Sequence, residues 1–293
     1  MNAFTIKDLE NLSGIKAHTI RIWEQRYAFL KPQRTQTNIR YYSNEELKVI
    51  LNIALLNKYG FKISHIDKMD NGDLLEKILS LNQLQAQYER TVNEMIGYMA
   101  DLDMDAFESV LSNYIASRGI EKTITQIIFP FLEKIGILWI TNHINPAQEH
   151  LVTNIIRQKL IVGIESIGTH LVVNKNILMF LPEGEHHELG LLFIYYLLKS
   201  RGARVWYLGA NVPMKDLDFV IKAKKPDLIF THLTALANNF NFDKFLTRLE
   251  MVTPNTPVIL SGQVTSNYKK KTPGNVELKK SLPEVMEFIA GLL

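Results

Sequence analysis

The stretch EHHELG, residues 185–190, separates two apolar runs of different length. The run before it, residues 177–181, is short and unbroken and ends at Pro182, which is typical of a buried parallel strand. The run after it, residues 191–198, continues to Gly202 and predicts a helix. A strand, a polar loop and a helix in this order predict a unit of an α/β sheet, in which ligands lie at the carboxyl ends of the strands.

His187 stands in this loop, at the carboxyl end of the first predicted strand. An imidazole at that edge can bind a metal ion, and Glu185, two residues earlier, can hold the other ring nitrogen. A histidine in a polar loop is more often exposed to solvent or hydrogen-bonded in an ordinary way. The loop taken alone leaves both roles open.

From residue 176 onward, predicted strands alternate with predicted helices. The predicted strands are 176–181, 203–208, 227–233, 257–261 and, more weakly, 275–279. This alternation predicts a doubly wound parallel sheet, a Rossmann-like fold, with right-handed crossovers. The carboxyl ends of such strands meet at one rim, so we expect His187, Thr231 and Gly262 to reach one ligand.

The segment before the sheet has helical periodicity and almost no strand signal. Helices are predicted at roughly 75–100, 103–117, 120–138 and 146–163. Four helices joined by short loops predict a four-helix bundle, which we place over residues 81–170. The fold class expected for the chain is therefore multidomain, with α and α/β parts.

The last of these helices carries a Glu-His pair in its first turns. Asn145 can cap it, with Pro146 at the first position, where a missing N–H costs nothing. Glu149 and His150 follow, and neighbouring helical positions point about 100° apart. At least one of the two therefore faces a neighbour or a ligand. Trp139, at the end of the preceding helix, packs either beside this pair or in the bundle core.

Positive charge is concentrated at the amino terminus. Residues 1–69 carry eleven Lys and Arg against six Asp and Glu, a net +5, whereas the whole 293-residue chain carries +3. A concentrated positive patch favours the phosphate backbone of a nucleic acid.

The pattern beneath this charge predicts a helix-turn-helix. Thr5 can cap a first helix, Gly14 stands at a turn, and a second helix is predicted over about 17–26, with Ile20 and Trp23 facing inward. The residues of the second helix that face outward are His18, Thr19, Arg21 and Arg26.

Two extended pieces around a polar turn follow at residues 31–42 and predict a wing. Arg34, Arg40 and Tyr41 in this segment are suited to contacting phosphates. A capping-box sequence at residues 43–46 then opens a third helix, predicted over about 45–59.

Composition excludes several classes of protein. With 46% hydrophobic and 22% charged residues, the chain has the balance of a soluble globular protein of two or three domains. No apolar run reaches the ~18 residues of a membrane helix, and we expect no signal peptide. The absence of cysteine excludes disulfides and thiolate metal sites and fits a reducing cytoplasm, so a cytoplasmic location is expected.

Residues 4–69 resemble the MerR family of bacterial transcription regulators. The matching motifs are TIRxWExRY from Thr19, PxRT from Pro32 and RxYS from Arg40, and the glycine usual after the tyrosine of the first motif is Ala28 here. The resemblance implies a winged helix-turn-helix over residues 1–70 that binds a pseudo-palindromic site in double-stranded DNA.

MerR proteins usually continue with a long dimerising helix, which the stretch MDNGD at residues 69–73 interrupts. We interpret residues 71–80 as a linker and expect the later domains to form the homo-oligomer, a dimer or a tetramer.

Residues 171–293 resemble the cobalamin-binding domain shared by methionine synthase and the corrinoid mutases. The family's DxHxxG appears as ExHxxG from Glu185, its SxL as TxL from Thr231, and its GG as SG from Ser261. The resemblance implies that His187 is the lower axial ligand of cobalt, that Glu185 orients it, and that Thr231 and Gly262 line the channel for the nucleotide tail. The residues assigned to the cofactor in this way are Glu185, His187, Gly190, Thr231, Leu233, Ser261 and Gly262.

The order of the three parts resembles light-responsive repressors of the CarH/LitR type, which carry Trp, nine residues and then Glu-His in the bundle. Trp139 and Glu149-His150 have this spacing. The resemblance places Trp139 and Glu149 over the upper face of cobalt, against an adenosyl group, with His150 nearby.

The function implied is a repressor whose oligomeric state and DNA affinity are controlled by adenosylcobalamin and light. The Ser-Gly pair keeps an alternative open, in which the fold has lost cobalamin and senses another ligand, cofactor or protein partner. An enzyme, such as a corrinoid carrier or a mutase, has no use for a DNA-binding domain, and we expect none.

Overall fold

The structure is a computed structural model that describes residues 3–140, 144–168, 173–235 and 240–292. For residues 137, 139, 140 and 174 it describes the backbone alone. The chain divides into two compact units, Met1–Ile156 and Arg157–Leu293, and each unit is described by itself. No helix among the described residues is long and apolar enough to cross a lipid bilayer.

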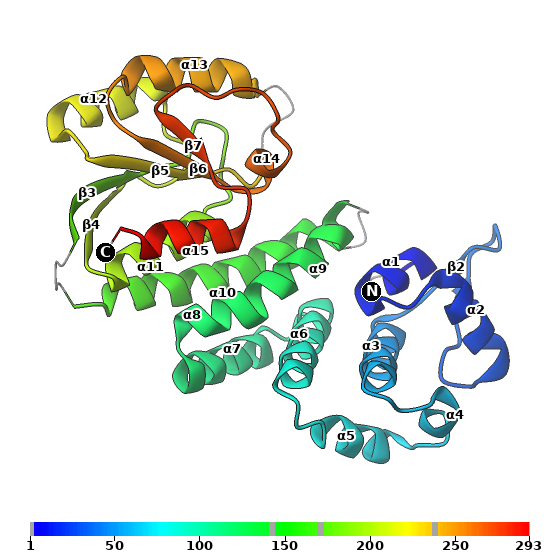
Figure 1. Cartoon of the computed structure of the whole chain (residues 1–293). Helices are drawn as coiled ribbons and strands as arrows, with labels where there is room; N and C mark the ends of the chain where they lie inside the picture. Colours follow the sequence, from blue (N-terminus) through cyan, green and yellow to red (C-terminus); the bar gives the residue numbers. More distant parts are fainter. Residues whose placement is uncertain (1–2, 141–143, 169–172, 236–239, 293) are drawn as a thin grey trace. The chain divides into compact units, whose positions relative to one another are not determined.

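The first unit begins with the predicted helix-turn-helix and wing (Figure 1). Its elements are α1 (Ile6–Ser13), α2 (Ala17–Arg26), β1 (Gln33–Arg34), β2 (Arg40–Tyr41), α3 (Asn44–Lys58) and α4 (Ile63–Ile66). Thr5 and Asp8 form a capping box at the start of α1, and Gly14 ends the helix with a φ of 76°. β1 and β2 pair antiparallel, which confirms the wing.

The core of this winged part comes from the inward faces of its helices. Ile20 and Trp23 of α2 are buried, as the sequence predicts, together with Leu9 of α1 and Leu47 of α3. Burying these side chains fixes α2 so that its polar face stays on the surface.

The linker predicted over residues 71–80 is wrong, because Asn71–Leu79 form a helix, α5. Asp70 caps it by accepting a hydrogen bond from the N–H of Asp73 at 2.8 Å. Its buried residue, Ile78, belongs to a helix that contacts α3. The polar stretch at residues 69–73 supplies the cap and the first turn of α5, and polar residues of these types are also typical of a linker.

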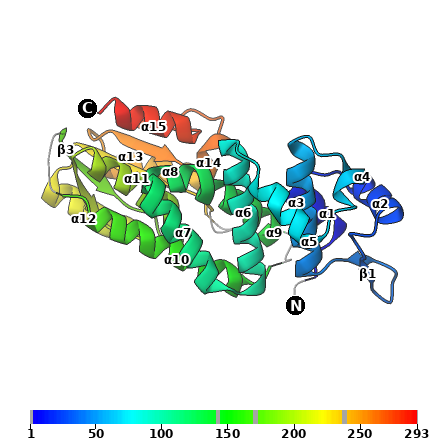
Figure 2. The ribbon, with the colours of Figure 1, turned by 90° about the horizontal axis from the view of Figure 1, so that it is seen from below.

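The remaining helices of the first unit are α6 (Leu84–Asp101), α7 (Met104–Arg118), α8 (Ile120–Thr123), the π-helix η1 (Ile124–Ile128), α9 (Phe129–Ile140) and the first half of α10 (Pro146–Glu165). The single helix predicted at 75–100 is therefore two helices, α5 and α6, separated at residues 80–83. The hydroxyl of Ser80 donates to the carbonyl of Lys77 at this break. α3 lies beside α6, and both views of the ribbon agree on this (Figure 1, Figure 2).

The start of α10 is fixed by polar contacts. Asn145 caps it as predicted, with its side-chain oxygen 2.9 Å from the N–H of Ala147. The amide of the buried Gln148 donates to the carbonyls of Met99 and Ala100, at the end of α6.

The second unit is built on a five-stranded parallel sheet of order β4-β3-β5-β6-β7, which confirms the doubly wound prediction. The strands are β3 (Val173–Met179), β4 (Ala203–Tyr207), β5 (Leu228–His232), β6 (Val258–Ser261) and β7 (Val276–Leu278). The helices are α11 (Leu189–Ser200), α12 (Met214–Lys224), α13 (Phe242–Val252), the short α14 (Gln263–Ser266) and α15 (Leu282–Ala290).

Helices cover both faces of this sheet. α12 and α13 lie on one face, and α11 and α15 lie on the other (Figure 1). Leu178, Ile229 and Leu260 belong to a buried cluster with Leu217 of α12 and Leu246 of α13. The boundary between the units lies inside α10, whose second half joins the sheet unit, because Lys199 donates to the carbonyl of Ile164 at 2.6 Å.

Candidate functional site

The loops that follow β3, β5 and β6 meet at the carboxyl edge of the sheet. His232 at the end of β5 is the register partner of Ser261 at the end of β6. The loop after β3 carries Glu185 and His187 and leads into α11, where Gly190 lies in the first turn. The predicted rim is therefore formed, and it lies within one unit of the chain.

Glu185 holds this rim together. Its side chain is 0% exposed. Oε1 accepts from the backbone N–H of His187 at 2.8 Å and contacts the ring Nδ1 at 2.7 Å. Oε2 accepts from the N–H groups of Thr234 and Ala235, at 3.1 and 2.8 Å. One buried carboxylate thus fixes the loop after β3 to the loop after β5.

The same contacts set the charge of Glu185 and the tautomer of His187. Burial acts to raise the pKa of Glu185, but hydrogen bonds from the ring and N–H of His187 and from the N–H of Ala235 hold it below its usual value. A carboxylate can only accept, so Nδ1 of His187 carries the proton. In the neutral ring the lone pair is then on Nε2, the nitrogen able to bind a metal ion. The His187 side chain is 59% exposed.

Two glycines of the rim have no room for a side chain. A Cβ added to Gly190 would lie 2.4 Å from Cδ2 and Nε2 of His232. A Cβ added to Gly262, which has a φ of 103°, would lie 2.2 Å from the carbonyl oxygen of Leu233. Leu233 is itself buried, and its N–H donates to the carbonyl of Ser261 at 2.8 Å.

Thr231 and His232 end β5, and their side chains point to opposite faces of the sheet. Thr231 is fully buried, and its hydroxyl has no hydrogen-bond partner among the described residues. His232 Nδ1 is hydrogen-bonded to the hydroxyl of Ser261 at 2.8 Å. Burial lowers the pKa of His232 to about 4, so its ring is neutral at physiological pH. The sequence predicts no role for His232, because its position against Gly190 depends on how distant segments of the chain pack.

The residues of this rim fit a corrinoid better than a simple metal ion. In the described part of the chain, no cluster of three or more His, Asp and Glu side chains could hold a metal ion. A cobalt already held by the four nitrogens of a corrin ring needs only one protein nitrogen below it, which the oriented His187 can supply. The orphaned hydroxyl of Thr231 provides a buried polar atom that a ligand could satisfy.

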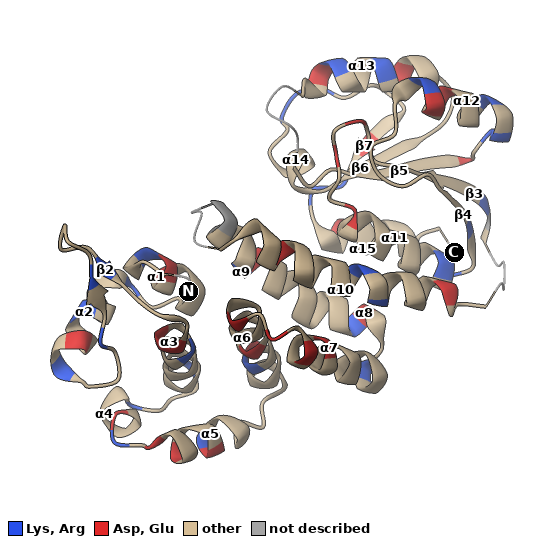
Figure 3. Ribbon diagram, turned by 180° about the vertical axis from the view of Figure 1, so that it is seen from behind, with Lys and Arg blue, Asp and Glu red and all other residues tan. Residues whose placement is uncertain are grey.

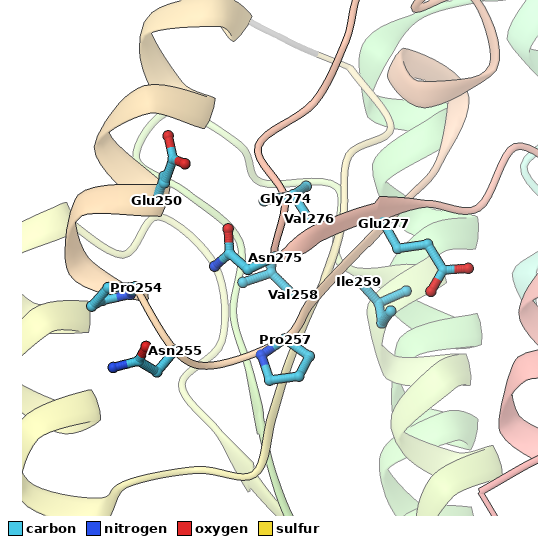
Figure 4. A pocket seen from close by; sticks show the side chains of 10 residues that line it. All are labelled: Glu250, Pro254, Asn255, Pro257, Val258, Ile259, Gly274, Asn275, Val276 and Glu277. Atoms are coloured by element: carbon cyan, nitrogen blue, oxygen red, sulfur yellow. The ribbon is translucent and has the colours of Figure 1, made fainter.

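A separate pocket of about 550 Å³ lies at the opposite edge of the sheet (Figure 4). Pro257 and Val258, where β6 begins, and Asn275 and Val276, where β7 begins, line it. Ligands of doubly wound sheets bind at the carboxyl edge. We therefore assign the site to the rim around Glu185 and not to this pocket.

The three residues expected above the cofactor belong to the first unit. Glu149 and His150 contact each other, with 3.0 Å between Oε2 and Nδ1, and their side chains are 24% and 69% exposed. His150 is exposed to solvent, and Glu149 is half-buried. Trp139 lies in α9, and its side chain is outside the described part of the structure.

The candidate DNA surface is the outer face of α2 and the wing. His18, Arg21 and Arg26 are exposed on α2, and Thr19 is half-buried with its hydroxyl 3.3 Å from Nε2 of His18. Figure 3 shows basic positions on α2 and at β2. This face carries the positive charge that a phosphate backbone attracts.

The side chains of the wing differ in their exposure to solvent and in their partners. Arg34 donates to the side chain of Asn38 at 2.8 Å and is exposed. Tyr41 donates to Gln33 at 2.5 Å. Arg40 is 29% exposed and pairs with Glu24 of α2 at 3.0 Å, so it also fixes the wing to the second helix.

Arg21→Ala and Arg26→Ala are each expected to weaken DNA binding. Each change removes one cation from a face where neither arginine forms an ion pair among the described residues. Losing one phosphate contact should reduce the slope of log affinity against log salt by roughly one. Titrating a labelled operator at several salt concentrations measures the slope, with Arg118→Ala, an exposed arginine at the end of α7, as the control. A slope that stays at the wild-type value would remove that residue from the interface.

Comparison with known proteins assigns families to these segments. Residues 4–72 match the MerR HTH family of regulatory proteins. Residues 175–277 match the B12 binding domain, and residues 91–162 match a second B12 binding domain model.

Two proteins of Myxococcus xanthus are similar along most of the chain. The chain is 28% identical over 276 residues to the HTH-type transcriptional repressor CarH, covering 91% of each protein. It is 27% identical over 226 residues to the HTH-type transcriptional repressor CarA, covering 76% of this chain and 74% of that protein. Both relatives are named as HTH-type transcriptional repressors.

A solved structure shares the fold. The monomethylamine corrinoid protein of Methanosarcina barkeri aligns with a TM-score of 0.53 at 12% identity, covering 70% of this chain and 99% of that protein. Identity this low shows the fold alone.

Proposed function

We propose that this chain, which joins a MerR-type helix-turn-helix to B12-binding domains, is a transcriptional repressor controlled by adenosylcobalamin and light. The observation that carries the proposal is the contact between the buried carboxylate of Glu185 and Nδ1 of His187 at the rim of the sheet. That pair presents one oriented imidazole at the place where a doubly wound sheet binds its ligand.

In this proposal His187 would supply the protein nitrogen that binds cobalt, with its ring oriented by Glu185. Thr231 offers its buried hydroxyl to the nucleotide tail, and Leu233, Ser261 and Gly262 complete the wall beside it. Trp139, Glu149 and His150 are the residues that would contact the adenosyl group. Adenosylcobalamin supplies a cobalt–carbon bond that visible light breaks.

In this proposal the oligomeric state of the protein controls its affinity for DNA. A homo-oligomer, dimer or tetramer, carries several copies of the exposed α2 face, and simultaneous contact with a pseudo-palindromic operator multiplies their affinity. Loss of the adenosyl group shifts the population between assemblies only if the bound ligand contacts the two states differently. The residues that would sense this loss are those proposed for the upper face.

The test is to purify the protein with adenosylcobalamin in darkness and to measure its assembly size and operator retention before and after green light. The proposal predicts a larger assembly that retains DNA in the dark and a smaller one that releases it after illumination. Cobalamin carrying a cyano group, which cannot lose an adenosyl group, is the control. Equal size and equal retention in dark and light would contradict light control.

A second candidate is a regulator that keeps the fold and senses another ligand or a protein partner. The observation that favours it is the position of the His232 ring, which lies against Gly190, a residue assigned to the cofactor. If folded protein incubated with cobalamin and desalted has no corrinoid absorption, this second function holds.

A further inference from the structure

The space beside Gly190, a residue assigned to the cofactor, is filled by a side chain of this protein, the ring of His232. A methyl group at Gly190 would come within 2.4 Å of two atoms of the His232 ring, so the ring lies directly against the Gly190 backbone. On the other side, the Gly262 backbone lies directly against the carbonyl of Leu233. The ring of His232 therefore lies between the start of α11 and the end of β5, in the space beside Gly190.

Two interactions keep the ring there. Nδ1 of His232 is hydrogen-bonded to the hydroxyl of Ser261 at 2.8 Å. His232 and Ser261 are register partners in neighbouring strands, so their backbones are fixed by the sheet. Burial also keeps the imidazole neutral, because it lowers the pKa of His232 to about 4. Displacing the ring breaks a partly buried hydrogen bond and leaves Ser261 to find another partner.

We infer that His232 is the residue that determines which corrinoids this site accepts. Resting on the cobalamin-binding function proposed above, the inference is that the imidazole of His232 competes with the aromatic base of the nucleotide tail for the space beside Gly190. A corrinoid without that base binds with His232 in place. Complete cobalamin binds only after His232 has turned away from Ser261, and its affinity is reduced accordingly.

The neighbouring residues are separate from this competition. Thr231, one position before His232, points to the opposite face of β5, so moving the ring leaves its buried hydroxyl unchanged. The ring of His187 is held by Glu185 through Nδ1. Cobalt ligation and tail recognition therefore depend on different residues and can be separated by mutation.

The experiment compares aquacobalamin with diaquacobinamide, the corrinoid that lacks the nucleotide base, on wild type and on His232→Ser. The full-length protein is titrated with each corrinoid and the dissociation constant is read from the absorption spectrum. His232→Ser is expected to bind aquacobalamin about tenfold more tightly and to change its affinity for cobinamide less than about threefold. The variant is compared with wild type for each corrinoid separately, since detaching the base from cobalt costs the same in both proteins.

Three further single variants and one double variant test for misfolding and for indirect effects. Ser261→Ala keeps the ring but removes its hydrogen-bond partner, and it should also tighten cobalamin binding selectively. His186→Ser changes an exposed histidine in the same loop and should alter neither affinity. In the ligand-free protein, Gly190→Ala should be destabilising, and combining it with His232→Ser should recover most of that loss if the ring lies where the structure places it.

The outcomes separate this inference from the function on which it rests. If His232→Ser changes neither affinity, or tightens both corrinoids equally, the inference is overturned while cobalamin binding stands. If folded wild type and folded variants bind neither corrinoid, the proposed function fails and the inference fails with it.

Discussion

Gly262→Ala is expected to destabilise the sheet unit by at least about 3 kcal/mol and to abolish ligand binding. Gly262 has φ 103° and ψ 177°, a conformation that is almost confined to glycine and costs a substituted residue roughly 1–3 kcal/mol. The added methyl would also lie 2.2 Å from the carbonyl oxygen of Leu233, which is backbone and cannot rotate aside. The loop after β6 would therefore have to separate from the end of β5.

Urea unfolding of the ligand-free protein measures this loss, with amide exchange of residues 258–261 as the local readout. Gly274→Ala is the matched control in the same unit, because a Cβ there meets nothing within 4 Å and the backbone φ is not positive. A Gly262→Ala variant as stable as Gly274→Ala would show that the two loops are not packed as described.

His187→Ala is expected to remove the lower protein ligand and to weaken corrinoid binding by at least tenfold. Nδ1 of His187 is held by a fully buried carboxylate, so the ring is already oriented before any ligand binds. Without the imidazole, the absorption of the bound corrinoid should move to the spectrum of a form that lacks the histidine nitrogen. Adding free imidazole should restore part of the wild-type spectrum.

Substitutions at neighbouring residues test whether the loss of corrinoid binding is due to the His187 imidazole itself. His186→Ala alters the adjacent exposed histidine and should leave binding unchanged. Glu185→Gln keeps the shape of the side chain but loses the charge that orients His187, and such a change should cost roughly 10- to 100-fold in affinity. Unchanged binding and spectrum in His187→Ala would overturn the assignment of His187 to cobalt.

Periodicity predicted most of the fold because the core residues repeat at the period of each element. The continuous apolar run before Pro182 is buried and includes the last three residues of β3, and Ile20 and Trp23 mark the inner face of α2. The prediction was wrong at residues 71–80, where polar residues cap a helix as readily as they form a linker. Asp70 acts there as a cap, and only its contact with the N–H of Asp73 distinguishes the two.

The part of the site that lies within one sequence motif could be predicted. The part in which separate strands and loops bring residues together could not. Glu185 and His187 are two residues apart, so their contact could be expected from the loop alone. The position of His232 over Gly190 depends on the register of β5 with β3 and on the entry of α11. The hydrogen bonds from Thr234 and Ala235 to Glu185 join segments about fifty residues apart, which no local pattern reports.

The central claim is that the imidazole of His187 reaches cobalt, and electron paramagnetic resonance tests it most directly. The protein is labelled with ¹⁵N-histidine, loaded with unlabelled cobalamin and illuminated or reduced to the paramagnetic Co(II) form without oxygen. Coupling to one axial ¹⁵N nucleus splits each cobalt line into a doublet, and the account predicts this doublet, with its loss in His187→Ala. A triplet from ¹⁴N, unchanged by the label, would mean that the nucleotide base of the cofactor still binds cobalt, and it would contradict the account.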